Sequence, residues 1–253
     1  LLGAYGGLVY AVPVIGGLLA DRYLGMRKAV VLGGVLLVLG HLGMAFEGEQ
    51  ARLVDGVVVR DDAALQVFYL SLALIIMGVG FLKPNISTIV GRLYPPGDPR
   101  MDSGFTIFYA GINVGALFAS LVCGFLGETY GWKYGFGAAG IGMIAGLIMF
   151  LWGQKYLGDV AEPNDPQRLR AKIGPLSREW LIYIGSIGGV LLVWQLIQHT
   201  WTVHGAMHLI ALALAAWFVW FLVKKCSTVE RGQMISLVLL IFGVLIFFTL
   251  YEQ

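Results

Sequence analysis

The chain has 253 residues, of which 58% are hydrophobic and 13% are charged, and its mean hydropathy is +0.80. Soluble domains carry about 25% charged residues, so this composition excludes an ordinary soluble protein and indicates a polytopic helical membrane protein. The net charge of +2, without Lys/Arg clusters outside the connections, gives no reason to expect a nucleic-acid partner. The two cysteines have no metal-ligand spacing and are not expected to pair.

Eight apolar segments follow one another, each suited to cross the roughly 30 Å hydrocarbon core as a helix. They cover residues 1–21, 28–46, 66–93, 104–126, 134–157, 179–200, 205–223 and 233–253. Thirteen Lys and Arg residues fall on one side of these segments and three on the other. Because cytoplasmic loops are rich in basic residues, the first side is predicted to be cytoplasmic. We interpret the abrupt ends of the chain as those of an interior fragment of a longer protein.

Lys83 interrupts the third segment, which is otherwise almost wholly apolar over residues 68–94. A lysine near the middle of a membrane helix costs on the order of 3 kcal/mol, so such residues usually line a hydrated pathway. Pro84 lacks an N–H and is expected to kink the helix by freeing the carbonyl of Gly80. Asn85 adds an amide next to them. A charge, a proline and an amide at one depth of the membrane together predict a wet cavity lined by this helix. The alternative is a lysine that reaches the headgroups or forms a structural ion pair.

Lys83 and Glu252 are the two charged residues that lie deep in apolar segments, the third and the eighth. The other sixteen Lys and Arg residues lie in connections or at membrane borders. Each of the two charges needs a partner or water, and the sequence leaves open whether they pair with each other. A desolvated carboxylate can exchange protons near neutral pH, which makes Glu252 a candidate for proton transfer.

Tyr109 and Asn113 are four residues apart in the fourth segment, as are Gly111 and Gly115. Gly111 and Asn113 lie about 200° apart on an ideal helix, so the polar pair would face a cavity while the glycine pair packs against another helix. Ordinary hydrogen bonding between helices is the alternative role for the polar pair. Close packing is also expected at two further pairs with this spacing, Gly3 with Gly7 and Gly142 with Gly146.

A long polar link, residues 158–178, follows the fifth segment. The sixth and seventh segments carry no internal charge, proline or paired amides. Because function inside a membrane normally depends on buried ionisable residues, we interpret these two segments as a structural hairpin.

Three stretches, GGLLADRYLGMRKAVVLGG (residues 16–34), FLKPN (81–85) and FTIFYAGINVGAL (105–117), occur in this order. Together they resemble the proton-dependent oligopeptide transporter family, within the major facilitator superfamily. The resemblance covers the whole chain and implies an all-α membrane protein with part of the superfamily fold, in eight transmembrane segments that include a two-helix insertion. Residues 1–157 would form helices two to six of the N-terminal bundle and 158–178 a cytoplasmic linker. Residues 179–231 would form the inserted hairpin with its cytoplasmic connection, and 232–253 helix seven at the start of the C-terminal bundle.

The resemblance also implies roles for single residues. Lys83 matches a fourth-helix lysine that takes part in proton coupling and peptide binding. Asn113 matches a fifth-helix asparagine that contacts the peptide backbone, and Tyr10 matches a second-helix tyrosine in the same pocket; Tyr5 is a less certain neighbour. Glu252 matches a seventh-helix carboxylate implicated in peptide binding, protonation and an outer gate.

Asp21 and Arg22 match the loop that latches the two bundles on the cytoplasmic side, which implies a role in gating. The family's first-helix Glu-x-x-Glu-Arg motif is absent from this chain. The implied function is a proton-coupled symporter that imports di- and tripeptides by alternating access, driven by the proton gradient without a cofactor. The expected setting is the bacterial inner membrane, where a functional monomer would meet peptide, protons and the lipid bilayer.

Two alternatives are kept. The first is a transporter of the same family for another small solute, such as nitrate or an amino acid. The second is a channel or a membrane-embedded enzyme. The chain contains no HExxH motif, no GxSxG motif and no paired His/Asp cluster, so it is not expected to be an enzyme.

Overall fold

The computed structural model describes residues 1–49 and 51–251, which contain nine α-helices and four short strands. The helices are α1 (Leu2–Leu19), α2 (Met26–Met44), α3 (Asp62–Arg92), α4 (Arg100–Tyr130), α5 (Trp132–Gly153), α6 (Pro166–Arg170), α7 (Arg178–Gln198), α8 (Thr200–Lys225) and α9 (Thr228–Tyr251). The strands are β1 (Arg52–Val54), β2 (Val57–Val59), β3 (Lys172–Ile173) and β4 (Leu176–Ser177). Contacts divide the chain into two units, Leu1–Thr200 and Trp201–Gln253.

Among the described residues, seven helices are long and apolar enough to cross a membrane: α1 with the turn that follows it, α2, α3, α4, α5, α7 and α8. They correspond to the first seven expected segments. Helix α9 covers most of the eighth expected segment, residues 233–253.

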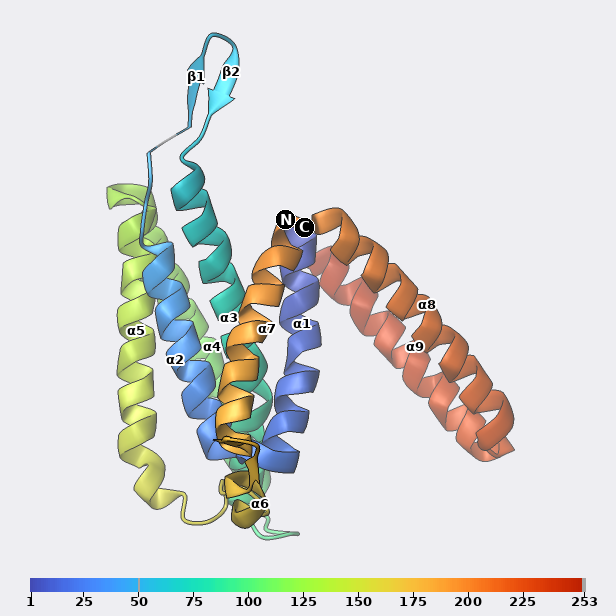
Figure 1. The fold of residues 1–253 in the computed structure, drawn as a ribbon. Coiled ribbons are helices and arrows are strands. Elements are labelled where there is room, and N and C mark those ends of the chain that lie inside the picture. Colours follow the sequence, from blue (N-terminus) through green and yellow to red (C-terminus); the bar gives the residue numbers. More distant parts are fainter. Residues whose placement is uncertain (50, 252–253) are drawn as a thin grey trace. The chain divides into compact units, whose positions relative to one another are not determined.

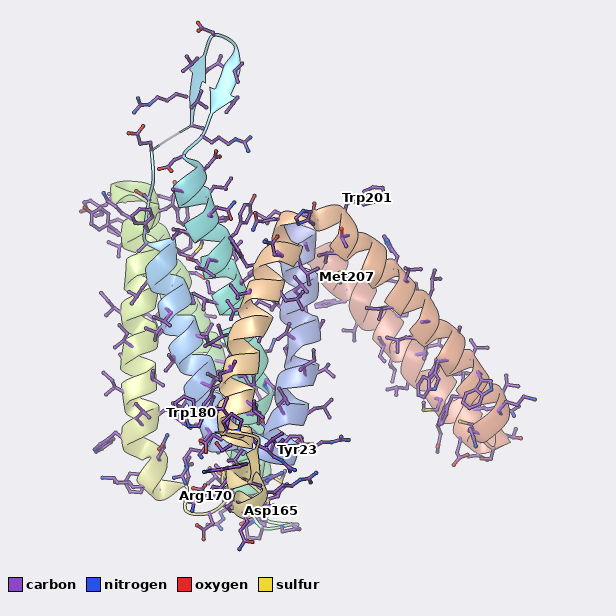
Figure 2. The ribbon with its side chains drawn as sticks, in the orientation of Figure 1. Tyr23, Asp165, Arg170, Trp180, Trp201 and Met207 are labelled. Atoms are coloured by element: carbon purple, nitrogen blue, oxygen red, sulfur yellow. The ribbon has the colours of Figure 1, made fainter. Side chains whose placement is uncertain are left out.

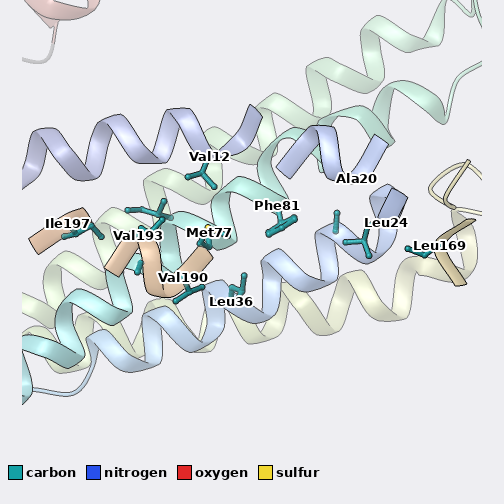
Figure 3. Packing of buried hydrophobic residues seen from close by; sticks show 13 residues of the cluster. Val12, Ala20, Leu24, Leu36, Met77, Phe81, Leu169, Val190, Val193 and Ile197 are labelled. Carbon is teal, nitrogen blue, oxygen red and sulfur yellow. The ribbon is translucent and has the colours of Figure 1, made fainter. Parts of the chain in front are cut away.

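Helix α3 is the centre of the first unit, where it packs against α1, α2 and α7 (Figure 1). Helix α5 covers the other side of α2 and meets α4. Figure 3 shows the main hydrophobic cluster, in which Val12 of α1, Phe81 of α3 and Val193 of α7 are buried together. Leu169 of α6 joins the same cluster, so the polar link predicted at 158–178 is anchored to the helices.

Glycines allow α3 to approach its neighbours closely. A Cβ atom added at Gly33 of α2 would lie 2.6 Å from the Leu82 nitrogen and 2.7 Å from the Gly78 oxygen. A Cβ added at Gly16 of α1 would collide with the carbonyl oxygen of Gly80. Small residues therefore mediate helix packing here, as is common in membranes.

Within the part of the chain that the structure describes, the glycine pairs expected to pack in α4 and α5 have no neighbouring helix against them. A Cβ atom at Gly111, Gly115, Gly142 or Gly146 would meet nothing within 4 Å among the described residues. That part of the prediction was wrong for these four positions, because the GxxxG spacing shows that a helix can be approached closely but does not identify a helix that approaches it.

Pro84 does not interrupt α3, which is continuous from Asp62 to Arg92. The carbonyl oxygen of Gly80, which lacks a partner four residues later because Pro84 has no N–H, faces the backbone of Gly16. A glycine opposite this carbonyl lets the two backbones approach each other closely, because no side chain stands between them.

The stretch between α2 and α3 is a β-hairpin at one end of the first unit (Figure 1). Its turn residues, Asp55 and Gly56, have φ angles of 50° and 80°, as the tight turn of a two-residue hairpin requires. Asp61 then caps α3 by accepting hydrogen bonds from the N–H of Ala64 (3.0 Å) and of Glu49 (3.2 Å). These bonds favour the carboxylate and lower the pKa of Asp61.

In the second unit, Arg231 ties the start of α9 to the end of α8. Its guanidinium donates to the carbonyl oxygens of Val223 (2.7 Å) and Cys226 (3.1 Å). These carbonyls belong to a helix end, where a cation is favoured by the helix dipole.

Candidate functional site

The structure brings Lys83 and Tyr10 together from two different helices. The Nζ atom of Lys83 lies 5.2 Å from the centroid of the Tyr10 ring, a cation–π contact worth about 0.5–1 kcal/mol at an exposed site. Both side chains are exposed, Tyr10 by 74%. Within the described residues, no hydrogen bond or ion pair engages the Lys83 ammonium, so its donors face outward from the unit.

The crossing of α1 and α3 holds this pair in register. Gly80 lies less than one turn before Lys83 and packs against Val12, which is itself less than one turn after Tyr10. The close approach at the glycine therefore fixes the distance between the two polar side chains that the helices carry.

The sequence predicted that Asn85 would lie beside Lys83 in a cavity, but Asn85 is not on the exposed face. The Asn85 side chain is buried, and its amide donates to the carbonyl oxygen of Phe81 in the same helix (2.7 Å). Two residues turn a helix by about 200°, so Lys83 and Asn85, which are two positions apart on α3, face nearly opposite sides. The hydrated chamber beside Lys83 stays a prediction.

Asn113 lies on α4 with an exposed side chain, and its amide donates to the carbonyl oxygen of Tyr109 (2.9 Å). Tyr109 is exposed too and stacks on Phe105 of the same helix. Within the described residues, the Asn113 side chain makes no hydrogen bond to Lys83 or Tyr10. Tyr5 instead lies half-buried against the hydrophobic cluster, and Glu252 lies outside the described residues.

Asp21 and Arg22 lie in a single π-helical turn, Ala20–Leu24, that joins α1 to α2. Turns of this kind are rare and are often found at functional sites. An Asp21 oxygen lies 3.9 Å from an Arg92 nitrogen at the end of α3, and the Asp21 carbonyl accepts from the Asn164 side chain (2.9 Å). Arg22 is exposed and has no ion pair among the described residues.

The linker, residues 158–178, docks on this turn and on the start of α2. The Arg27 side chain forms an ion pair with Glu162, and the backbone N–H of Arg27 donates to the carbonyl oxygen of Ala161 (3.0 Å). The guanidinium of Arg168 lies 5.1 Å from the Tyr23 ring centroid. Figure 2 shows Tyr23, Asp165, Arg170 and Trp180 at the same end of the unit.

A second ion pair joins α2 to the start of α7. The Lys28 ammonium donates to a carboxylate oxygen of Glu179 (2.6 Å), and that oxygen also accepts from the Tyr183 hydroxyl (3.0 Å). The sequence interpretation named neither Glu162 nor Glu179 as a partner of the loop. The available signal was the charge pattern, since Arg27 and Lys28 are adjacent cations and both acids lie at the borders of the linker.

Asp98 stabilises the short connection between α3 and α4. The side chain of Arg100 donates to both Asp98 oxygens, and this hydrogen bonding lowers the pKa of Asp98 to about 2. The carboxylate is therefore charged throughout the physiological pH range.

Comparison with known families gives one consistent result. The model of the POT family, PTR2, matches residues 27–253. The chain is 36% identical to the "Uncharacterized transporter YclF" of Bacillus subtilis and 31% identical to a di-/tripeptide transporter of Lactococcus lactis subsp. cremoris. Each alignment covers 100% of this chain and 49% of the relative, so the chain spans about half the length of these curated relatives.

Solved structures are similar in the same way. A crystal structure of a peptide transporter POT in complex with alafosfalin is 36% identical, with a TM-score of 0.67 over 93% of this chain and 45% of the other. A POT family transporter in complex with a thioalcohol-conjugated peptide is 30% identical, with a TM-score of 0.68 over 93% and 46%. Another, in complex with 5-aminolevulinic acid, is 32% identical, with a TM-score of 0.66 over 90% and 45%.

Proposed function

This chain belongs to the POT family, and we propose that the protein it forms part of is a proton-coupled symporter that imports di- and tripeptides by alternating access. Members of the family are transporters and not enzymes. The chain is a multi-pass membrane protein with part of the major facilitator superfamily fold. The observation that carries the proposal is the match of the whole chain to a relative described as a di-/tripeptide transporter.

The contact between Lys83 and Tyr10 supports a substrate-binding role for both residues. A short peptide carries a carboxylate at one end, and the Lys83 ammonium is the complementary charge with three donors to offer. The Tyr10 ring fixes the position of this ammonium through the cation–π contact. Asn113 would bind a peptide N–H through its amide oxygen, and one N–H of its amide donates to the Tyr109 carbonyl.

Glu252 and Lys83 are the proposed proton-coupling residues. Protonation of a carboxylate in the transport pathway removes a charge that the peptide amine or a lysine would otherwise contact. Such a change can bias the equilibrium between outward-open and inward-open states. Asp21 and Arg22 are proposed as gating residues on the cytoplasmic side, where Arg22, which has no ion pair within the described residues, could contact another part of the protein. We also propose the bacterial inner membrane as the location and a monomer as the functional unit.

Reconstituted full-length protein tests the proposal. An inward proton gradient should accumulate labelled dialanine in liposomes, and Lys83→Ala should abolish this gradient-driven uptake. Lys133→Ala is the matched control, because the Lys133 ammonium also lies over a tyrosine ring, that of Tyr134 at 5.1 Å. Unimpaired uptake by a folded Lys83→Ala variant would refute the role of Lys83, and no accumulation by the parent protein would refute the function.

The second candidate is a transporter of the same family for another small solute. It is favoured by the similar structure that holds 5-aminolevulinic acid, which is not a peptide. Competition of labelled dialanine uptake by other dipeptides, single amino acids, 5-aminolevulinic acid and nitrate separates the two candidates. Competition by dipeptides alone supports the first candidate, and stronger competition by a single amino acid or by nitrate supports the second.

A further inference from the structure

An apolar cleft of about 700 Å³ lies between α1, α3 and α7, apart from the contact of Lys83 with Tyr10. Its walls are mostly leucine, isoleucine and valine side chains of α1 and α7. Along α1 it extends from Leu8 to Leu19, about 16 Å at the rise of an α-helix, and it continues to Tyr23 in the turn that follows. One leaflet of a bilayer has a hydrocarbon thickness of about 15 Å, so the cleft is long enough for an acyl chain.

The charged groups of the cleft are concentrated at the end that carries the linker, which is expected to face the cytoplasm. Arg168 of α6 and Arg178, the first residue of α7, line it there, and no acidic residue does among those that the structure describes. The guanidinium of Arg168 lies over the ring of Tyr23, a cation–π contact that does not use its N–H donors, so these can bind an anion. The hydroxyl of Ser186, which also lines the cleft, already donates to the Ile182 carbonyl (2.7 Å).

The acids nearest to these arginines in the chain are already engaged. Glu179 pairs with Lys28 and accepts from the Tyr183 hydroxyl. Asp165 accepts from the backbone N–H of Arg168 and so caps α6. Within the described residues, neither Arg168 nor Arg178 has an ion pair. The cleft therefore combines an apolar interior with a positively charged opening at the level of the headgroups.

We propose that this cleft binds one anionic phospholipid of the cytoplasmic leaflet, with its phosphate between Arg168 and Arg178 and an acyl chain between α1 and α7. Basic pockets between membrane helices on the cytoplasmic side are suited to anionic headgroups. A peptide is a poor fit, because the apolar walls offer no partners for its amide groups. The phosphate needs the two cations and the acyl chain needs the apolar walls, so both parts of the lipid contribute.

Native mass spectrometry of the full-length protein with defined lipids tests the headgroup contacts. Dioleoylphosphatidylglycerol should bind in preference to dioleoylphosphatidylcholine, and replacement of Arg168 and Arg178 by Gln should reduce this preference by about five-fold per arginine. The control is Lys172→Gln with Lys225→Gln, which removes the same charge outside the cleft and should leave the preference unchanged. Equal binding of the two lipids, or equal loss in both double variants, would overturn the site.

A second pair of variants tests the acyl-chain contacts. Gly185 lines the cleft and Gly188 does not, and a Cβ atom at either position meets no described residue within 4 Å. Gly185→Leu should therefore fill the cleft without a clash and weaken binding of phosphatidylglycerol, while Gly188→Leu should not. Equal binding by these two variants would overturn the proposal, as would competition by glycerol phosphate, which has the headgroup charge but no acyl chain. Thermal unfolding verifies that each variant is folded.

Discussion

At the scale of single residues, Gly16 and Gly80 determine how closely α1 approaches α3. Neither position has room for a side chain: a Cβ at Gly16 meets the Gly80 carbonyl, and a Cβ at Gly80 meets the side chain of Val12. The next residue, Gly17, is different, because its Cβ would lie 3.6 Å from the Pro84 side chain, an ordinary van der Waals distance. A glycine is therefore sterically required at position 16, whereas position 17 has room for a small side chain.

Gly16→Ala is expected to destabilise the protein by about 1–3 kcal/mol, because the added methyl group forces two packed backbones apart. Gly17→Ala, the matched control, is expected to be neutral or slightly stabilising, since Ala favours a helix over Gly by up to about 1 kcal/mol. Thermal unfolding of the two full-length variants in detergent measures the difference. Equal melting temperatures would show that the crossing of α1 and α3 can relax.

Tyr10→Leu is expected to weaken peptide binding by roughly two- to five-fold, because the Lys83 ammonium loses a cation–π contact of about 0.5–1 kcal/mol. Tyr10→Phe keeps the aromatic ring and should show a smaller loss. Concentration dependence of dipeptide uptake by the reconstituted full-length protein gives the apparent affinities. A larger loss for Tyr10→Phe than for Tyr10→Leu would mean that the hydroxyl and not the ring is the important group.

The candidate site could be predicted from the sequence only in part. Lys83 was identifiable because a cation in an apolar segment is exceptional, and the family resemblance added Tyr10, which contacts it. The prediction that Asn85 lies beside Lys83 was wrong, because residues two positions apart on a helix face nearly opposite sides and Asn85 is buried. The binding and gating roles of the site residues stay predictions, and Glu252 lies outside the described residues.

At the scale of elements, the linker is more than a polar connection between helices. Leu169 is buried in the hydrophobic cluster, and Glu162 pairs with Arg27 at the start of α2. These contacts hold the linker against the turn that contains Asp21 and Arg22. Any rearrangement of that turn during transport would therefore involve the linker.

Glu162→Gln is expected to loosen the linker, because it removes the charge that Arg27 contacts. An exposed ion pair contributes about 0.2–1 kcal/mol to stability, and the side chains of this pair are about 30% exposed. Loss of up to about 1 kcal/mol should accelerate hydrogen exchange of residues 158–178 by up to about five-fold. Glu49→Gln is the control, since the Glu49–Arg52 pair is about 70% exposed and lies outside the linker. Hydrogen exchange of the full-length protein is measured by mass spectrometry. An unchanged exchange rate of the linker in Glu162→Gln would contradict this expectation.

Element boundaries were partly readable from the sequence. Helix α3 begins where Asp61 caps it, although the predicted segment began four residues after Asp62. The β-hairpin was missed, even though Asp-Gly between valines is a strong signal for a two-residue turn. The docking of the linker was not predictable in this way, because its contacts join residues more than 130 positions apart.

At the scale of the whole molecule, the family resemblance and the fold class are confirmed by the POT family match and by the solved transporter structures. This success has a physical reason, since eight long apolar segments and a few motifs restrict the possible arrangements strongly. In the first unit the linker and the β-hairpin lie at opposite ends (Figure 1). This arrangement agrees with the sequence-based assignment of the two connections to opposite sides of the membrane. The linker end carries Arg27, Lys28 and Arg92.

The end of the first unit that carries the linker is expected to face the cytoplasm, because thirteen Lys and Arg residues lie on that side of the segments and three on the other. A cysteine placed at Asp159 in the linker should therefore react with a membrane-impermeant maleimide only after cells are permeabilised. A cysteine at Val58, an exposed residue of the β-hairpin, should react in intact cells. Both variants are made in full-length protein without Cys123, Cys226 or other accessible cysteines. The reverse pattern would place the hairpin inside the cell and would contradict the proposed direction of the gate.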